Sequence, residues 1–392
     1  MKQFDIVIAG GAMAGMTLAL AINKYSQGAL SIAVVEPYQA DYDAHPGFDS
    51  RAIALSLGTV DLFKQFGLWQ DISQLATAIK HIHVSDCGHA GMTDIDHQEI
   101  AAEALGYVIE LADVGRYYND RVSGCDGIHM LCPAHVSQIE RFQHEVRVTL
   151  NDGQSIVGKL LVASDGAMST CCELLGIESN LHDFDQVAVI ANVKTSQAHH
   201  GHAFERFTSS GPLALLPMSE HRMSLVWCLN PEQAKRMMSL NDVAFMQSLQ
   251  NTFGWRLGKF ETIGQRSCYP LTQSFRQQNV SHRFAVVGNA AQTLHPIAGQ
   301  GFNLGIRDIA TLTESIMSRL DDPGAYPVLS EYRRRREQDR VATASLTSSL
   351  VGIFSNDYLS FRIARNLGLA ALDNVAMLKV PLLTRTLGLV AR

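Results

Sequence analysis

The sequence predicts an α/β fold built on a parallel, Rossmann-like sheet, and three observations predict it. A glycine turn follows the first apolar strand, an acidic residue ends the second, and another glycine-rich segment follows a buried strand late in the chain. With 392 residues the chain is long enough for two to three domains, or for one large fold with inserted parts.

The composition limits the classes of protein to which this chain can belong. Hydrophobic residues make up 46% and charged residues 18%, where about a quarter charged is typical. Such a chain is not disordered, because disordered chains are rich in charge and poor in apolar residues. The net charge of −6 gives no basic field for phosphate, so no nucleic-acid partner is predicted. The sparse charge predicts either a large interior or a surface that meets something apolar.

The first elements have the layout of a dinucleotide-binding unit. Residues 4–9 predict a strand, residues 16–27 a helix, and residues 31–35 a second strand. The turn brings the helix N-terminus to a pyrophosphate, and the acid after the second strand binds ribose hydroxyls. Ala12 stands where the middle glycine of this motif is usual, so we expect a slightly displaced cofactor. The candidate cofactor residues are Gly10, Gly11, Ala12, Met13, Ala14, Gly15 and Glu36.

The same segment could have a different role. The uncharged run over residues 6–23 could be a signal peptide or a spanning helix, and Gly11 with Gly15 could be a membrane helix-packing motif. A glycine turn that only packs a helix on a strand is a further possibility. Glu36 stands at the spacing expected of the ribose ligand and favours the dinucleotide unit.

A second candidate cofactor segment lies late in the chain. Residues 283–291 predict a buried strand that reaches a turn, and residues 294–303 open a helix that runs towards Arg319. The helix start offers N–H groups and a positive dipole, which suit the electron-rich pyrimidine edge of a reduced flavin. An ordinary glycine-rich loop is the alternative. The candidates in this segment are Asn289, Pro296, Gly299, Gln300, Gly301, Phe302 and Asn303.

Together with residues 159–167, which include Asp165 and Gly166, these segments resemble the three fingerprints of class A FAD-dependent aromatic hydroxylases. Further segments make the chain similar to the ubiquinone-biosynthesis hydroxylases within that group. They are residues 48–56, 203–207, 211–217 and 294–303. The resemblance spans nearly the whole chain. It implies an FAD-binding domain like that of para-hydroxybenzoate hydroxylase, an inserted β-sheet substrate domain and C-terminal helices.

The domain organisation follows from this resemblance and from local patterning. Alternating residues at 81–85 and 222–227 predict strands of a separate sheet, which would lie over the flavin. We expect the FAD-binding domain over 1–75, 98–180 and 275–330, the substrate domain over 76–97 and 181–274, and a C-terminal helical region over 331–392.

Two motifs depart from the family pattern. Asn289 replaces the usual Asp and Gln292 stands where His is common, which is similar to the 2-octaprenyl-6-methoxyphenol hydroxylase branch. Cys171 and Cys172 stand where an Arg often follows the Asp-Gly pair. In the family this segment contacts the nicotinamide and the flavin phosphate. The resemblance therefore says less about how NADPH or NADH reaches the flavin in this chain.

The resemblance implies a specific chemistry. NADPH or NADH would bind transiently and reduce FAD. O2 would then add at C4a of the flavin to give a hydroperoxide. This hydroperoxide would hydroxylate a polyprenylated phenol of the 2-polyprenyl-6-methoxyphenol type. Other ubiquinone-biosynthesis proteins are the expected partners. Three alternatives stay open: hydroxylation at another ring position, an FAD-dependent reductase or dehydrogenase of the same fold, and a non-catalytic scaffold of the biosynthetic complex.

Two residues are candidates for catalysis. Arg51 precedes an apolar stretch, and the resemblance places its guanidinium beside the flavin, where it would govern the ring position. A surface arginine in a loop is the alternative. His295 could orient or deprotonate a phenol, because histidine titrates near neutral pH. A structural histidine that caps the turn at Pro296 is the alternative.

Three further segments carry charge or histidine. His199, His200 and His202 have no partner at metal-ligand spacing, so a polar loop and no metal are predicted. Arg333 to Arg336 predict a solvated helix face. Residues 359–392 carry five basic residues against one acidic residue among many apolar ones. We expect a cytoplasmic protein. Its basic tail could lie on the inner face of the membrane, or it could form a helix packed on the body or on a partner.

Overall fold

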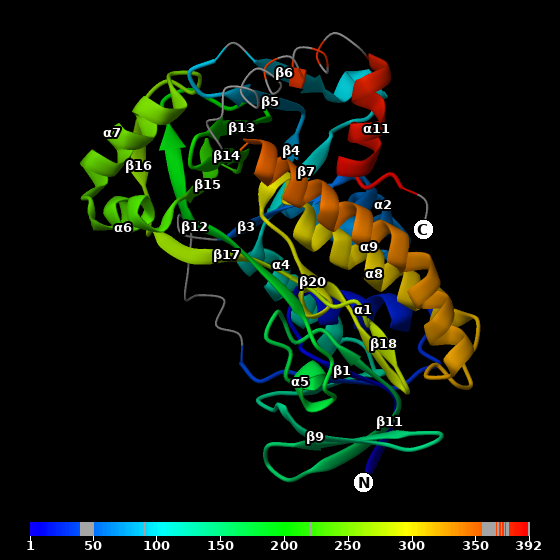
Figure 1. The fold of residues 1–392 in the computed structure, drawn as a ribbon. Helices are drawn as coiled ribbons and strands as arrows, with labels where there is room; N and C mark the ends of the chain where they lie inside the picture. Colours follow the sequence, from blue (N-terminus) through cyan, green and yellow to red (C-terminus); the bar gives the residue numbers. More distant parts are fainter. Residues whose placement is uncertain are drawn as a thin grey trace.

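The structure is a computed structural model, drawn as a ribbon in Figure 1. It describes residues 1–39, 51–89, 91–219, 221–354, 366, 368–369, 371, 373 and 376–390. Residues 48–50 of one resemblance segment lie outside these ranges, and so do the basic tail residues Arg362, Arg365 and Arg392.

The predicted parallel sheet is present. Among the described residues, eight strands form this first sheet, with the main order β18-β19-β11-β1-β2-β8. The strands from β19 to β8 run parallel to one another, and the antiparallel strands β10 and β9 extend the sheet from β11. The bounds are β1 Lys2–Ala9, β2 Ile32–Val35, β8 Ile128–Leu131, β9 Val136–Arg141, β10 Val146–Leu150, β11 Ser155–Ala163, β18 Val280–Ser281 and β19 Phe284–Val286.

Strand β1 is buried on both faces, as parallel strands usually are. Ile6 and Ile8 join the core beneath the helices, whereas Val7 and Ala9 join the core on the opposite face. This two-sided burial continues into the first helix. Most of the uncharged run over residues 6–23 is therefore interior, apart from the turn and first helical residues over 11–14 and Asn23. Among the described residues we find no helix that is long and apolar enough to cross a membrane.

A second sheet and a small third sheet complete the β structure. Nine strands form the second sheet in the order β20-β17-β12-β15-β14-β13-β5-β6, with β16 beside β12, and the third has the order β3-β7-β4. The predicted strands at 81–85 and 222–227 lie within β5 and β15. The bounds are β3 Ala52–Ser56, β4 Ala76–Ile79, β5 His81–Asp86, β6 Met92–Asp96, β7 Gly106–Glu110, β12 Asn180–Thr195, β13 His202–Thr208, β14 Gly211–Pro217, β15 Arg222–Leu229, β16 Phe260–Ile263, β17 Ser267–Phe275 and β20 Gln292–Thr293.

The helices cover these sheets in separate groups. Helices α1, α8 and α9 pack over the first sheet, and α6 and α7 cover one face of the second sheet (Figure 1). The bounds are α1 Met13–Tyr25, α2 Leu57–Phe66, α3 Trp69–Ile72, α4 Leu111–Ser123, α5 Thr170–Leu174, α6 Pro231–Ser239, α7 Asp242–Phe253, α8 Gln300–Met317, α9 Tyr326–Phe354 and α11 Ala376–Thr386.

Helix α1 begins at Met13, three residues before the predicted start. The turn needs only Gly10, Gly11 and Ala12, and Gly15 already lies inside the helix. A Cβ at position 15 would lie 1.8 Å from the carbonyl oxygen of Gly10. The missing side chain therefore lets the first helical turn pack directly on the end of β1.

The prediction of a solvated face was wrong for one arginine of α9. Arg333 and Arg334 are exposed, and Arg334 pairs with Glu331 at 2.7 Å. Arg336 is instead fully buried, with its Nε 2.8 Å from Asp308 Oδ1. Helix α9 packs along α8, and the acidic residue on α8 holds this guanidinium in the interior.

The described part of the C-terminal tail packs on the body of the protein. Leu383 and Leu387 are buried in one apolar cluster with Ile79 and Leu105. Lys379 lies 2.7 Å from Glu99, so one of the tail's cations is paired inside the molecule. For these residues the structure therefore shows a helix packed on the body.

Candidate cofactor and substrate site

Four predicted cofactor segments meet at one edge of the first sheet. Strands β1, β2, β11 and β19 are parallel, so the residues that follow them lie side by side. Backbone hydrogen bonds continue across these ends, from Gly10 N to Val35 O at 2.8 Å and from Ser164 N to Ala9 O at 2.8 Å. The residues brought together are Gly10, Gly11, Ala12, Glu36, Asp165, Gly166 and Asn289.

The glycine turn leaves the N-terminus of α1 open. Gly10 has a φ of +99°, and a Cβ there would lie 2.5 Å from the carbonyl oxygen of Ser164, so only glycine fits. Ala12 is the N-cap and makes no side-chain capping bond, and its side chain is exposed. The first N–H groups of α1 and the helix dipole therefore face outwards, as a pyrophosphate requires. Met13 and Ala14 form the partly exposed first turn.

Glu36 lies against this turn. Its Oε2 accepts a hydrogen bond from Gly11 N at 2.6 Å, and its Oε1 accepts one from Tyr38 N at 3.0 Å. Two backbone donors thus fix the carboxylate at the end of β2, beside the helix start. This is the position expected of a group that binds ribose hydroxyls.

One carboxylate oxygen of Asp165 is buried and accepts no hydrogen bond in the described structure. Its Oδ2 accepts a hydrogen bond from Cys171 N at 3.1 Å, but its Oδ1 is buried and has no hydrogen-bond partner in the described structure. Buried polar atoms are nearly always paired, so this oxygen indicates a partner that a ligand would supply. Cys171 and Cys172, where the family often has Arg, are buried in the apolar core behind it.

The segment after β20 forms an open loop. Ala298 is exposed, and Pro296, Gly299, Gly301 and Phe302 are partly exposed. A Cβ at Gly301 would meet no atom within 4 Å, so open space lies beside the start of α8. The N-terminus of α8 has no side-chain cap either, and its N–H groups are available. A flat ring system fits against such a backbone.

Gln300 and Asn303 hold this loop from behind. Gln300 Nε2 donates to Ala298 O at 3.0 Å and to Thr386 O of α11 at 2.9 Å. Asn303 Nδ2 donates to Ala54 O at 3.0 Å, and its Oδ1 accepts from Ser56 N at 2.9 Å. Both side chains are buried, so they fix the loop to β3 and α11.

A buried polar network supports the turn that carries Asn289. Gln292 Nε2 donates to Asp308 Oδ2 at 2.6 Å, and Gln292 Oε1 accepts from Arg340 Nε at 2.6 Å. Arg336 extends the network, because it pairs with both Asp308 and Asp339. Burial raises the pKa of Asp339, but the charges of Arg336 and Arg307 outweigh this effect and hold that pKa below its ordinary value. Gln292 is therefore a bridge between α8 and α9, and Asn289 itself is exposed.

His295 is buried and fully engaged. Its Nδ1 accepts a hydrogen bond from Ile297 N at 3.2 Å, so Nε2 carries the proton that binds Gln186 Oε1 at 2.9 Å. Burial lowers the pKa of His295 to about 4, and the ring is neutral at pH 7. Both ring nitrogens are hydrogen-bonded to protein groups, as expected of a structural histidine that caps the turn at Pro296.

Arg51 immediately precedes β3. It is exposed, and its carbonyl oxygen accepts a hydrogen bond from Leu111 N at 2.7 Å. Burial and Cys228 raise the pKa of Tyr269 on β17, and the charge of Arg51 opposes that rise. The guanidinium is therefore within electrostatic reach of the second sheet.

The second sheet has one closed and one partly open face. Its closed face is an apolar core covered by α6 and α7. On the other face, one residue from each of β5, β13, β14, β15 and β12 lies beside the next across the sheet, and all five residues are partly exposed. We call this set the accessible row; its members are Val84, Glu205, Ala214, Val226 and Ile190.

Glu205 is the member of this row that the sequence analysis missed. It is the acidic member of an otherwise apolar row, and these surroundings raise its pKa to about 7. The signal was present in the sequence. In residues 203–207, Phe204 and Arg206 alternate with Ala203, Glu205 and Phe207, so a carboxylate shares a strand face with two apolar residues.

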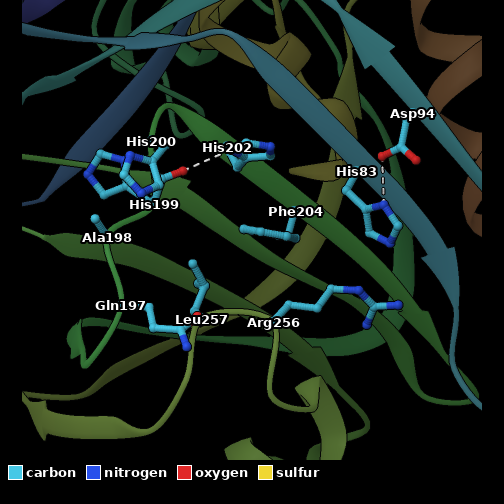
Figure 2. A pocket seen from close by; sticks show the side chains of 10 residues that line it. All are labelled: His83, Asp94, Gln197, Ala198, His199, His200, His202, Phe204, Arg256 and Leu257. Carbon is cyan, nitrogen blue, oxygen red and sulfur yellow. Dashed lines mark hydrogen bonds and ion pairs between the residues drawn. The ribbon is translucent and has the colours of Figure 1, made fainter.

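The histidine-rich segment lines a different pocket, of about 560 Å³, on the closed-face side of the second sheet (Figure 2). His83 Nδ1 bonds Asp94 Oδ1 at 2.7 Å, and His202 Nδ1 bonds His199 O at 3.0 Å. Phe204, which packs towards α7, also lines this pocket. In the ranges that the structure describes, no group of three or more potential ligands could hold a metal ion.

Comparisons with known proteins identify a family and a fold. The FAD binding domain family matches residues 3–347. The ubiquinone hydroxylase UbiL of Rhodospirillum rubrum is 33% identical over 381 residues, which cover 96% of this chain and 88% of that protein. The 3-demethoxyubiquinol 3-hydroxylase of Escherichia coli (strain K12) is 29% identical over 389 residues, 98% of each chain. The crystal structure of p-nitrophenol 4-monooxygenase PnpA from Pseudomonas putida DLL-E4 has the same fold, with a TM-score of 0.81, 17% identity and 99% coverage of both chains.

Proposed function

The chain belongs to the FAD binding domain family, and on this premise we propose that it hydroxylates the ring of a polyprenylated phenol of the 2-polyprenyl-6-methoxyphenol type in ubiquinone biosynthesis. It is an FAD-dependent aromatic hydroxylase that uses a nicotinamide reductant and O2. The observation that carries the proposal is the 33% identity to a ubiquinone hydroxylase over 96% of the chain, because that span includes both the cofactor edge and the second sheet.

The residues at the sheet edge fit FAD. The N–H groups of α1 would hold the pyrophosphate, Glu36 the ribose, and the unpartnered Oδ1 of Asp165 a hydroxyl or N–H group of the cofactor. The open backbone at 296–302 would hold the ring. When bound, the flavin supplies the activation of oxygen. The protein orients the phenol and excludes water.

The accessible row supports an apolar aromatic substrate. Val84, Ala214, Val226 and Ile190 offer apolar contacts, and small-molecule sites are mostly apolar with few polar groups. The polyprenyl chain of the proposed substrate is insoluble in water. We therefore also propose that the protein collects it at the inner face of the membrane, in a complex with other ubiquinone-biosynthesis proteins.

The ring position is proposed from Asn289 and Gln292, which are similar to the branch that acts on 2-octaprenyl-6-methoxyphenol. A second candidate is hydroxylation at another position, because the Escherichia coli relative bears the name of a 3-demethoxyubiquinol 3-hydroxylase. Profiling of quinone intermediates in a strain that lacks this protein separates the two. Accumulation of a 2-polyprenyl-6-methoxyphenol supports the first, and accumulation of a later, methoxylated intermediate supports the second.

The reductase and scaffold hypotheses can each be tested directly on the purified protein. A reductase or dehydrogenase would turn over without oxygen, whereas a hydroxylase must consume O2 when the phenol stimulates NADPH oxidation. A non-catalytic scaffold would stay colourless after incubation with FAD. A colourless protein would overturn the proposed function.

A further inference from the structure

Glu205 points to the open side of the second sheet, away from α7. Phe204 packs edge-on against Phe253 of α7, with ring centroids 5.2 Å apart, and Arg206 Nε donates to Thr252 O at 2.8 Å. Successive side chains of a strand alternate between its faces. The carboxylate of Glu205 therefore lies on the opposite face, with Ala203 and Phe207.

That face meets the candidate flavin loop one side chain further along β13. Phe207 belongs to a buried apolar cluster with Ile297, which lies between Pro296 and Ala298, and it stacks on Phe354 of α9 at 3.7 Å. Residues two apart on a strand are separated by about 7 Å. Glu205 thus stands about 7 Å along β13 from a residue that shares an apolar cluster with the loop that we assign to the flavin ring.

The carboxylate has no partner of its own. Ala214 and Val84 flank it on the neighbouring strands, and within the described ranges no hydrogen bond or ion pair reaches it. Its apolar surroundings raise the pKa of Glu205 to about 7, so both protonation states are populated near neutral pH. Acids and bases that transfer protons in enzymes work best in this range.

Most of the other ionisable groups described on this face are already committed. Burial and Glu205 raise the pKa of the Cys228 thiol, and burial raises that of Tyr269, so both keep their protons. Arg222 pairs with Glu110 at 2.6 Å at the far end of β15. Asp86 is buried and bound by Asn366, and both ring nitrogens of His295 are bonded. Two exposed cations, Arg51 and Lys194, complete the set.

We propose that Glu205 is the base that deprotonates the phenol, an inference that rests on the proposed function. The O–H bond of the phenol breaks, its electron pair stays on the ring oxygen, and the proton moves to a carboxylate oxygen of Glu205. The phenolate is more electron-rich than the phenol and so attacks activated oxygen faster. The carbon that gains the hydroxyl group then loses its hydrogen as a proton to water, and the oxygen that departs when the O–O bond breaks takes up a proton from water. As the ring becomes aromatic again, the ring oxygen takes its proton back from Glu205 and the carboxylate is restored.

The test uses the FAD-bound protein, NADPH and 2-methoxy-6-prenylphenol, a soluble probe with one isoprene unit. The rate of product formation by the wild-type enzyme should rise with pH around about 7. E205Q should be slower at neutral pH by about 100-fold or more. It should recover as the pH approaches the pKa of the phenol itself, because the substrate then ionises without help. A ring-fluorinated probe, which ionises at lower pH, should lose less in E205Q.

Several readouts separate this role from a structural one. FAD content and the rate of flavin reduction without phenol should be unchanged in E205Q, while the product formed per NADPH oxidised should fall. E140Q, at an exposed position on β9, is the matched control and should behave as wild type. E205D keeps a carboxylate and should keep the rise near neutral pH even if E205Q folds poorly; a flat profile in E205D overturns the inference. Equal rates of E205Q and wild type at all pH values also overturn it, whereas absence of product from wild type contradicts the proposed function instead.

Discussion

Asp308 on α8 and Arg336 on α9 form an ion pair at 2.8 Å, and both side chains are completely buried. Asp308 also accepts a hydrogen bond from Gln292, which follows the turn that carries Asn289. The pair therefore connects the long helix α9 to the cofactor edge. A charge in this position is held in the interior by its partners and not by solvent.

D308N should destabilise the protein strongly. The substitution leaves the Arg336 guanidinium in the interior without its main partner, which typically costs about 3–5 kcal/mol. Urea unfolding of the FAD-bound protein measures the loss. E331Q removes an exposed partner of Arg334 on the same helix and should cost at most about 1 kcal/mol. Equal losses in the two variants would show that α9 does not depend on the buried pair.

G15A should abolish FAD binding or weaken it severely. The new Cβ would lie 1.8 Å from Gly10 O, so the first turn of α1 must move away from the end of β1. That movement displaces the N–H groups that we propose bind the pyrophosphate. The visible absorbance of the purified protein reports the FAD content. G352A is the control, since no atom lies within 4 Å of its Cβ position in α9 and alanine favours helix.

D165A should weaken FAD binding by about 10- to 100-fold. Hydrogen bonds to charged groups contribute about 1.5–3 kcal/mol, and Asp165 Oδ1 has no other partner in the described structure. Titration calorimetry of the FAD-free protein measures the affinity. D120N, on the exposed side of α4, should bind FAD as wild type does. Unchanged affinity in D165A would remove this carboxylate from the cofactor site.

E205Q should change how stability depends on pH. The pKa of Glu205 is raised from 4.5 to about 7 in the folded protein, so the folded state binds the proton more tightly than the unfolded chain. Wild type therefore loses stability as the pH rises from about 4.5 to about 7. Between pH 4 and pH 8, unfolding free energies should shift in favour of E205Q by on the order of 1–3 kcal/mol.

The exposed control E140Q should show no comparable shift with pH. A wild-type curve parallel to that of E205Q would mean that the carboxylate is as well solvated in the folded protein as in the unfolded chain. The pKa of Glu205 would then be ordinary, and the acid–base role would lose its basis.

The membrane proposal concerns basic residues outside the described part of the tail. R362Q with R365Q removes two of its five cations and leaves α11 and its buried leucines intact. Each basic residue near an anionic surface contributes about 1 kcal/mol, so co-sedimentation with vesicles that contain phosphatidylglycerol should fall clearly. Unchanged co-sedimentation would remove the tail charge from the proposal, and neutral vesicles serve as the control.

The sequence by itself determined the cofactor edge. Strand, glycine turn, helix, second strand and Glu36 are contiguous, and their pattern depends on local periodicity and on a φ of +99° that glycine adopts easily. The parallel sheet then places Asp165 and Asn289 beside them, because strands of one direction end at one edge. The resemblance to the hydroxylase family predicted the fold because it rests on these same local motifs.

Only the tertiary structure decided which polar side chains became interior. Arg336 is buried because Asp308 faces it from another helix, and His295 is neutral because the packing around it, which includes Gln186 109 positions away, buries the ring. Glu205 lies on an accessible apolar row that five strands build together. Burial and pKa depend on which distant segments pack together, and no local pattern contains that information.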